Sequence, residues 1–131
     1  MHRKYHGIAR FIIIMIAEAH ASDEWPVGKS VSFCKQHKTM DERLKICNEF
    51  AREFRHVDPK YKNRTVEDPE NLILTVPIWV DDMTNGFMNT FASWPFRYFV
   101  IQNGRLKFKA QPNLKTSGYD LKDILPFIYS H

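Results

Sequence analysis

The sequence predicts a single α/β domain, and three observations support this fold class. Residues 11–16 (FIIIMI) are all large and apolar, as in a strand buried on both faces of a parallel sheet. A stretch with apolar residues at helical spacing follows near residues 39–54. Asn103-Gly104 separates two apolar runs, which is the strongest hairpin signal in the chain. With 131 residues, the chain has the length of one domain with one core, over residues 1–131.

The first predicted strand extends from about residue 9 to residue 17. Gly7 precedes it and is a suitable terminator for a short helical segment. Residues 21–36 are expected to form a loop, because Pro26 and Gly28 break regular structure.

Thr39 and Glu42 have the spacing of a capping box, which opens the predicted helix and contributes about 1 kcal/mol. The apolar positions of this helix are Leu44, Ile46, Cys47, Phe50, Ala51 and Phe54. Residues 56–71 are charged and contain two prolines, so we expect a long loop there.

The second half of the chain adds another strand, two helices and the hairpin. A buried strand is predicted over residues 72–80, and a short helix over residues 84–93. This helix turns Phe87, Met88 and Phe91 inward. Asp120 is the expected cap of a last helix. Its apolar face consists of Leu121, Ile124, Leu125 and Ile128.

Composition narrows the classes of function. The net charge of +4 is modest and the basic residues are dispersed, which indicates a solvated surface and no nucleic-acid partner. No stretch approaches the roughly 18 apolar residues that span a membrane. Cys34 and Cys47 have neither metal-ligand spacing nor a Cys-x-x-Cys pattern. We therefore expect no bound cofactor or metal, and no membrane segment in these residues.

Glu18 and His20 are the first candidate site residues, because they follow the apolar strand directly. Ligands of open α/β sheets bind beyond the carboxyl ends of parallel strands. Imidazole titrates near neutral pH, and a neighbouring carboxylate can fix its tautomer. The pair is a candidate for acid/base chemistry, although Glu18 could instead be a loop carboxylate that caps nearby amides.

The longer string FIIIMIAEAHASDEW, residues 11–25, resembles the signature strand and loop of the iodothyronine deiodinases, selenoenzymes with a thioredoxin-like fold. Other segments resemble parts of the same family in the same order. They are Gln36-His37 with Glu42-Arg43, Val80-Asp81 with Met83, and residues 97–105.

The resemblance implies an α/β, thioredoxin-like fold that is N-terminally truncated. The central first strand, most of the first helix and the family's selenocysteine or cysteine are absent from residues 1–131. The missing strand would lie between the strands at residues 11–16 and 98–101. Neighbouring strands lie about 4.8 Å apart, so its absence leaves unpaired backbone groups on both sides. Pro95 stands where thioredoxin-like proteins carry a cis-proline, with a trans turn proline as the alternative.

The activity implied by the resemblance is reductive removal of iodide from thyroid-hormone-like iodinated phenols. His20 would donate the proton, Glu18 would orient or recharge it, and His37 would bind the phenolic end of the substrate. A thiol cosubstrate would regenerate the nucleophile, and residues 1–131 alone should be inactive. A homodimer and membrane association of the whole protein are further implications of the resemblance.

Two departures from the family pattern leave the substrate open. Met15 stands where the family has tyrosine, and Lys115 has the wrong spacing for the family's basic substrate contact. One alternative to an enzyme is a non-catalytic thioredoxin-like interaction or dimerisation module. Another is a small secreted glycoprotein, since residues 2–21 mimic a signal peptide and Asn63-Arg64-Thr65 is a glycosylation motif.

Overall fold

The computed structural model describes residues 7–56, 76–116 and 118–129. Its elements are β1 (Ile13–Met15), α2 (Met40–His56), β2 (Ile78–Val80), α3 (Gly86–Phe91), β3 (Phe99–Gln102), β4 (Arg105–Lys109), the 3-10 helix η3 (Leu121–Ile124) and α4 (Leu125–Tyr129). This mixture of helices and strands agrees with the predicted α/β class. The predicted loop over residues 57–71, its glycosylation motif and the start of the strand predicted at residue 72 lie outside the described residues.

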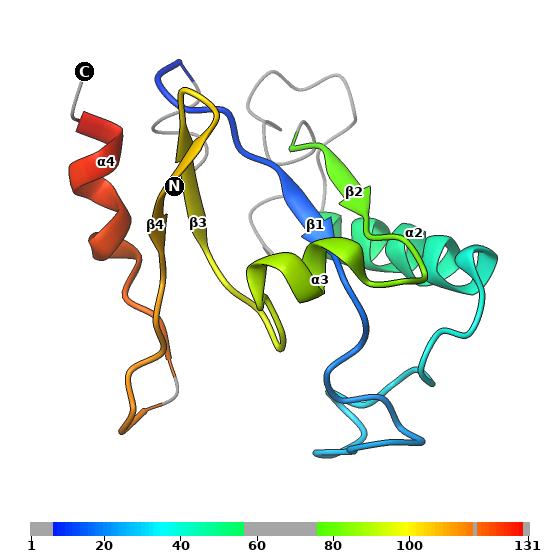
Figure 1. Cartoon of the computed structure of the whole chain (residues 1–131). Coiled ribbons are helices and arrows are strands. Elements are labelled where there is room, and N and C mark those ends of the chain that lie inside the picture. The colour runs from blue at the N-terminus through cyan, green and yellow to red at the C-terminus, as the bar shows by residue number, and fades with distance from the viewer. Residues whose placement is uncertain (1–6, 57–75, 117, 130–131) are drawn as a thin grey trace.

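The described strands form two separate sheets. β1 pairs with β2 in parallel, with Ile13 opposite Ile78 and Met15 opposite Val80. β3 pairs with β4 in antiparallel orientation, and no described strand joins the two pairs. In Figure 1, β1 lies between β2 and the β3–β4 hairpin. One edge of β1 therefore faces β3 without a strand of the described chain between them.

The prediction for the first strand was wrong in its length and burial. The structure assigns a strand only to Ile13–Met15, and all its residues are half-buried. Ile12, just before it, is 38 % exposed. A strand becomes fully buried when layers cover both faces and strands pair on both edges. Among the described strands, β1 pairs with β2 alone, so the isoleucine run stays partly open.

The capping box of α2 is confirmed. The Thr39 hydroxyl accepts from the Glu42 amide at 3.2 Å, and the Glu42 carboxylate accepts from the Thr39 amide at 3.3 Å. Cys47 is buried as expected, but Leu44 is 43 % exposed. The half-buried Ile46, Phe50 and Ala51 also agree with the prediction. Arg43, next to Leu44, is buried in its place.

The hairpin at Asn103-Gly104 is also confirmed. Asn103 and Gly104 have φ of 53° and 69°, the left-handed conformation that a tight two-residue hairpin turn requires. Phe99 at the start of β3 meets Phe91 of α3 edge-on, with ring centroids 5.6 Å apart. The Trp94–Pro95 peptide bond is cis, as the resemblance implied.

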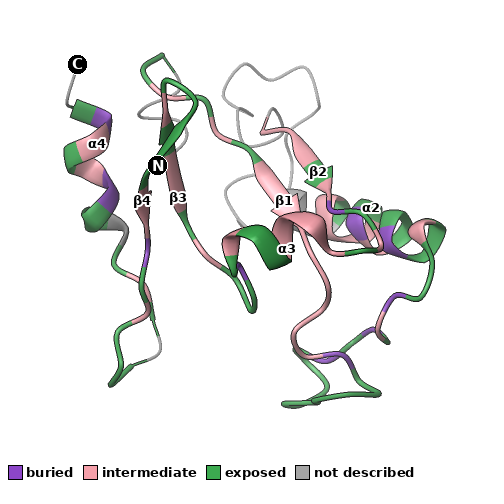
Figure 2. Cartoon of the chain, in the orientation of Figure 1, coloured by how far each residue is buried: buried purple, intermediate pink, exposed green. Residues whose placement is uncertain are grey.

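The last helices cover the hairpin and hold the core. The Asp120 side chain accepts from the Lys122 amide at 2.8 Å, which confirms it as the cap of η3. Ile124 and Ile128 are buried, and the half-buried side chains around them come from Phe11, Val100, Phe108 and Leu125. Figure 2 shows that buried residues are few along the ribbon. Among the described helices, none has the length and apolar character needed to cross a membrane.

Candidate active site

Glu18 lies on the loop after β1, and its carboxylate is engaged at both oxygens. One oxygen accepts from the main-chain amide of His20 at 3.1 Å. The other accepts from the Cys34 thiol, with Sγ 3.9 Å away. The carboxylate thus bonds to the backbone of His20, which fixes the path of the chain into the histidine.

Gln36 ties the two ends of this loop together. Its side-chain amide donates to the Glu18 carbonyl at 2.9 Å and to the Glu24 carboxylate at 3.1 Å. Its carbonyl oxygen accepts from the Glu18 amide at 3.1 Å. The Gln36 main-chain amide donates to Asp23 at 2.8 Å, and this bond lowers the pKa of the Asp23 carboxyl. Gln36 belongs to a family-like motif in the sequence, but nothing local to it indicates a partner 18 residues away.

The His20 ring is half-buried beside an exposed aromatic pair. Its centroid lies 5.1 Å from that of Trp25, at an interplanar angle of 56°. Trp25 in turn stacks on Trp94, with centroids 5.9 Å apart and planes 21° apart. The His20 Nδ1 atom is buried and has no hydrogen-bond partner among the described residues. The described residues therefore leave the hydrogen-bonding capacity of this ring nitrogen unused.

His37 lies deeper than His20, at the end of the same loop. Its side chain is 6 % exposed, and neither ring nitrogen has a partner within the described part of the chain. Burial lowers the pKa of His37 below its usual value, the charge of Arg43 lowers it further, and that of Glu18 opposes the shift. The lowered pKa favours the neutral form of the His37 ring, and the Glu18 carboxylate is near enough to oppose the shift.

Comparisons with known proteins show the family to which the chain belongs. The family model described as iodothyronine deiodinase matches residues 1–128. The chain belongs to the iodothyronine deiodinase family. It is 28 % identical to the type I iodothyronine deiodinase of Xenopus laevis over 82 % of this chain and 35 % of that protein. It is 25 % identical to the thyroxine 5-deiodinase of Bos taurus, over 92 % of this chain and 33 % of the relative. This deiodinase-family chain thus spans about a third of the length of these relatives, and no solved structure matches it.

Both cysteines of this deiodinase-family chain are free and buried. Burial and then the nearby Glu18 carboxylate raise the pKa of the Cys34 thiol, and burial raises that of Cys47. A nucleophilic cysteine needs the opposite shift, because the thiolate is the reactive form. Neither described thiol therefore has the environment of a nucleophile. The described residues also contain no group of three side chains that could hold a metal ion.

Arg43 fixes the loops behind the site and was not predicted to do so. Its side chain is 1 % exposed and donates to the carbonyl oxygens of Asp81 and Asp82, at 3.0 and 2.7 Å. It also donates to the Asn85 side chain at 2.9 Å. These bonds join α2 to the segment between β2 and α3, directly after the end of the parallel strand pair.

Asp81 is a structural residue in this arrangement. Its carboxylate is buried and accepts from the main-chain amides of Phe87 and Met88, both at 2.9 Å. Amides in the first turn of a helix otherwise lack partners, so Asp81 stabilises the start of α3. The family-like Val80-Asp81 motif therefore positions a helix.

The lowered pKa of His37 predicts a stability that depends on pH. The unfolded chain takes up this proton near pH 6.5, whereas the folded protein takes it up only at lower pH. The contribution to the free energy of unfolding should be complete above about pH 6.5 and should fall as the pH drops from there toward the folded pKa. Urea unfolding at about pH 7.5 and about pH 5.5 measures the change. His37→Gln should reduce the difference between the two pH values, and an unchanged difference in this variant would contradict the assignment.

Proposed function

We propose that this chain forms part of an oxidoreductase that removes iodide reductively from an iodinated phenol, with His20 as the proton donor. The observation that carries the proposal is the His20 ring, which follows the parallel strand and keeps Nδ1 free of partners among the described residues. Family membership supplies the reaction class, since the relatives are named deiodinases. The substrate class follows from the same names and from the aromatic rings beside His20.

The reaction needs a nucleophile, a proton donor and a reductant. A selenolate or thiolate takes the iodine, and the electron pair of the carbon–iodine bond stays on the ring carbon. His20 delivers a proton to that carbon, which leaves the ring with hydrogen in place of iodine. A thiol cosubstrate then reduces the iodinated nucleophile, which releases iodide and leaves a mixed disulfide or its selenium equivalent, and a second thiol restores the nucleophile.

Glu18 and His37 take supporting roles in this proposal. Glu18 holds the His20 backbone through the 3.1 Å bond to its amide, and so it positions the proton donor. His37 is neutral, so one ring nitrogen can accept from a phenolic hydroxyl and the other can donate to a phenolic oxygen. Both of its nitrogens lack partners in the described residues, which leaves this capacity unused.

We place the nucleophile outside residues 1–131, on a strand between β1 and β3 of a thioredoxin-like sheet. Two observations support this placement. The two strand pairs lie with β1 and β3 toward each other and are not joined by a described strand (Figure 1). The described thiols are buried, and their pKa values are raised. A strand paired with both β1 and β3 would unite the pairs into one sheet and would end beside the His20 loop.

Residues 1–131 alone should therefore release no iodide. Incubated with an iodinated thyronine and dithiothreitol, they should give the same iodide signal as their His20→Ala variant. The same domain joined to a strand that carries selenocysteine or cysteine should turn over. Turnover by residues 1–131 that Cys34→Ser abolishes would show instead that the nucleophile is Cys34.

The alternative is a non-catalytic interaction or dimerisation module of the same fold. It predicts that the domain remains inactive after the nucleophile-bearing strand is added. The edges of β1 and β3 that pair with no described strand would then bind a second copy of the chain, and sedimentation would detect a dimer.

A further inference from the structure

We propose that Trp25 and Trp94 form an aromatic platform beside His20 that binds the flat ring of the substrate. The inference rests on the proposed function and deepens it, because it assigns a substrate-positioning role to Trp94. No pattern in the sequence assigns a role to Trp94.

The geometry of the three rings supports this assignment. Trp25 and Trp94 come from different loops, one after β1 and the other after α3, and their planes are only 21° apart. His20 packs against Trp25 on the same loop, with centroids 5.1 Å apart. A ring that packs on the Trp25 side of this stack would thus lie next to the proposed proton donor, with Trp94 supporting Trp25 from its other side.

The platform is open to solvent. Trp25 is 57 % exposed and Trp94 is 40 % exposed, although each has a large apolar surface. Covering an exposed indole with a ligand is usually favourable, because it removes apolar surface from water. Aromatic rings prefer offset-stacked or edge-on partners. Iodinated phenols suit this surface, because iodine makes the ring larger and more polarisable while the hydroxyl stays polar.

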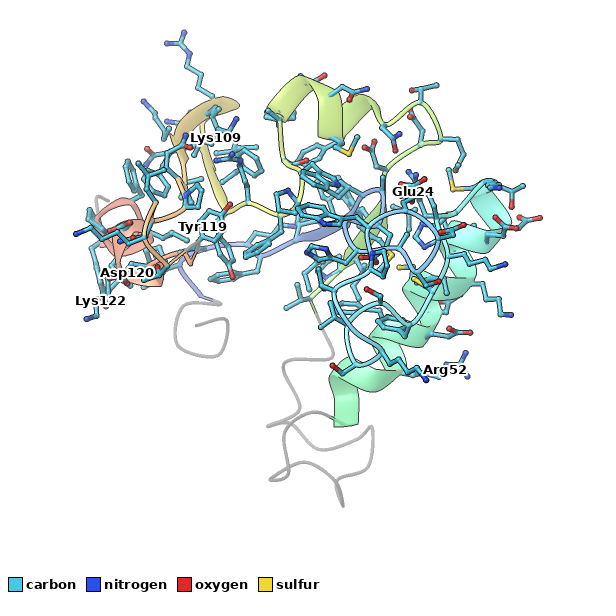
Figure 3. All side chains as sticks on the ribbon, turned by 90° about the horizontal axis from the view of Figure 1, so that it is seen from below. Glu24, Arg52, Lys109, Tyr119, Asp120 and Lys122 are labelled. Carbon is cyan, nitrogen blue, oxygen red and sulfur yellow. The ribbon has the colours of Figure 1, made fainter. Side chains whose placement is uncertain are left out.

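A second exposed aromatic cluster lacks the features of a reactive site. Phe96, Tyr98 and Tyr119 pack together, and the Tyr119 hydroxyl donates to the Phe96 carbonyl at 2.7 Å. No histidine ring packs against them among the described contacts. In Figure 3, Tyr119 lies near Lys109 and Asp120, at the opposite end of the molecule from Glu24. The Trp25–Trp94 pair is therefore the aromatic surface that belongs to the His20 loop.

The test is binding of 2,6-diiodophenol to residues 1–131, measured by equilibrium dialysis, with 2,6-dimethylphenol as the ligand without iodine. Trp94→Leu keeps apolar bulk without the ring, and it should raise the dissociation constant about three- to tenfold. Trp94→Phe should stay within about twofold of the parent. Trp79→Leu is the matched control, because Trp79 is 53 % exposed on β2 and no described ring contact joins it to the pair, so this variant should bind as the parent does.

The outcomes separate the platform from the proposed function. If Trp94→Leu and the parent have equal dissociation constants for 2,6-diiodophenol and the same circular dichroism, the platform proposal is wrong. An equal loss in Trp79→Leu overturns it as well, since binding would then follow any exposed tryptophan. A third outcome is binding that depends on Trp94 in a domain that stays inactive after the nucleophile-bearing strand is added. This result would support the proposed platform and contradict the proposed reaction.

Discussion

Replacement of His20 by alanine is expected to lower the turnover of the nucleophile-bearing protein by about 10²–10⁴-fold, the usual contribution of a general acid. The physical reason is that the ring carbon must gain a proton as the carbon–iodine bond breaks. His20 offers the Nδ1 atom that has no partner among the described residues. Iodide release at saturating substrate measures the loss as kcat.

His37→Ala is the matched comparison, because His37 lies at the end of the same loop but is buried and neutral. The loss of one hydrogen bond to substrate costs about 0.5–1.5 kcal/mol, so the effect should be about tenfold or less and should fall mainly on KM. His20→Gln should be as slow as His20→Ala, because an amide cannot donate the proton. If His20→Ala and His37→Ala had equal effects confined to KM, His20 would be a binding residue.

Arg43→Ala is expected to lower the free energy of unfolding by about 3–5 kcal/mol. The substitution removes three hydrogen bonds from a side chain that is 1 % exposed. It also leaves the carbonyl groups of Asp81 and Asp82 without these donors. Unfolding in urea, followed by circular dichroism, gives the free energy.

Arg52→Ala provides the control for this prediction. Arg52 lies on the same helix but is exposed, and it bonds only weakly to the Asn48 carbonyl, at 3.4 Å (Figure 3). Its removal should change the free energy of unfolding by about 0.5 kcal/mol or less. Arg43→Lys should fall between the two variants, because one ammonium group cannot reach all three acceptors. Equal stabilities of Arg43→Ala and Arg52→Ala would show that the buried guanidinium does not hold α2 in place.

Local signals in the sequence predicted the elements well. The Thr39–Glu42 box, the Asn103-Gly104 turn and the Asp120 cap each depend on residues within a few positions of one another. Such contacts are decided by backbone geometry that recurs in all proteins, so a short pattern suffices to predict them.

Contacts between distant segments were not predictable in the same way. The bonds of Arg43 cross about 40 positions of sequence and those of Gln36 cross 18. In the sequence, each looks like an ordinary polar residue on a surface. The predicted burial of β1 was wrong for a related reason. The burial of a strand depends on the strands beside it and not on its own isoleucines. Glu18 and His20 were predicted as a pair, but the carboxylate bonds to the histidine backbone, which no spacing rule distinguishes from a bond to the ring.

The environment of the two thiols has a practical consequence for chemical labelling. Alkylating reagents attack thiolates, and both Cys34 and Cys47 are buried with a raised pKa. At neutral pH the native domain should consequently react slowly with iodoacetamide. A reactive cysteine or selenocysteine joined to this domain would be alkylated first, and its labelling by mass spectrometry would identify it without replacing either native cysteine.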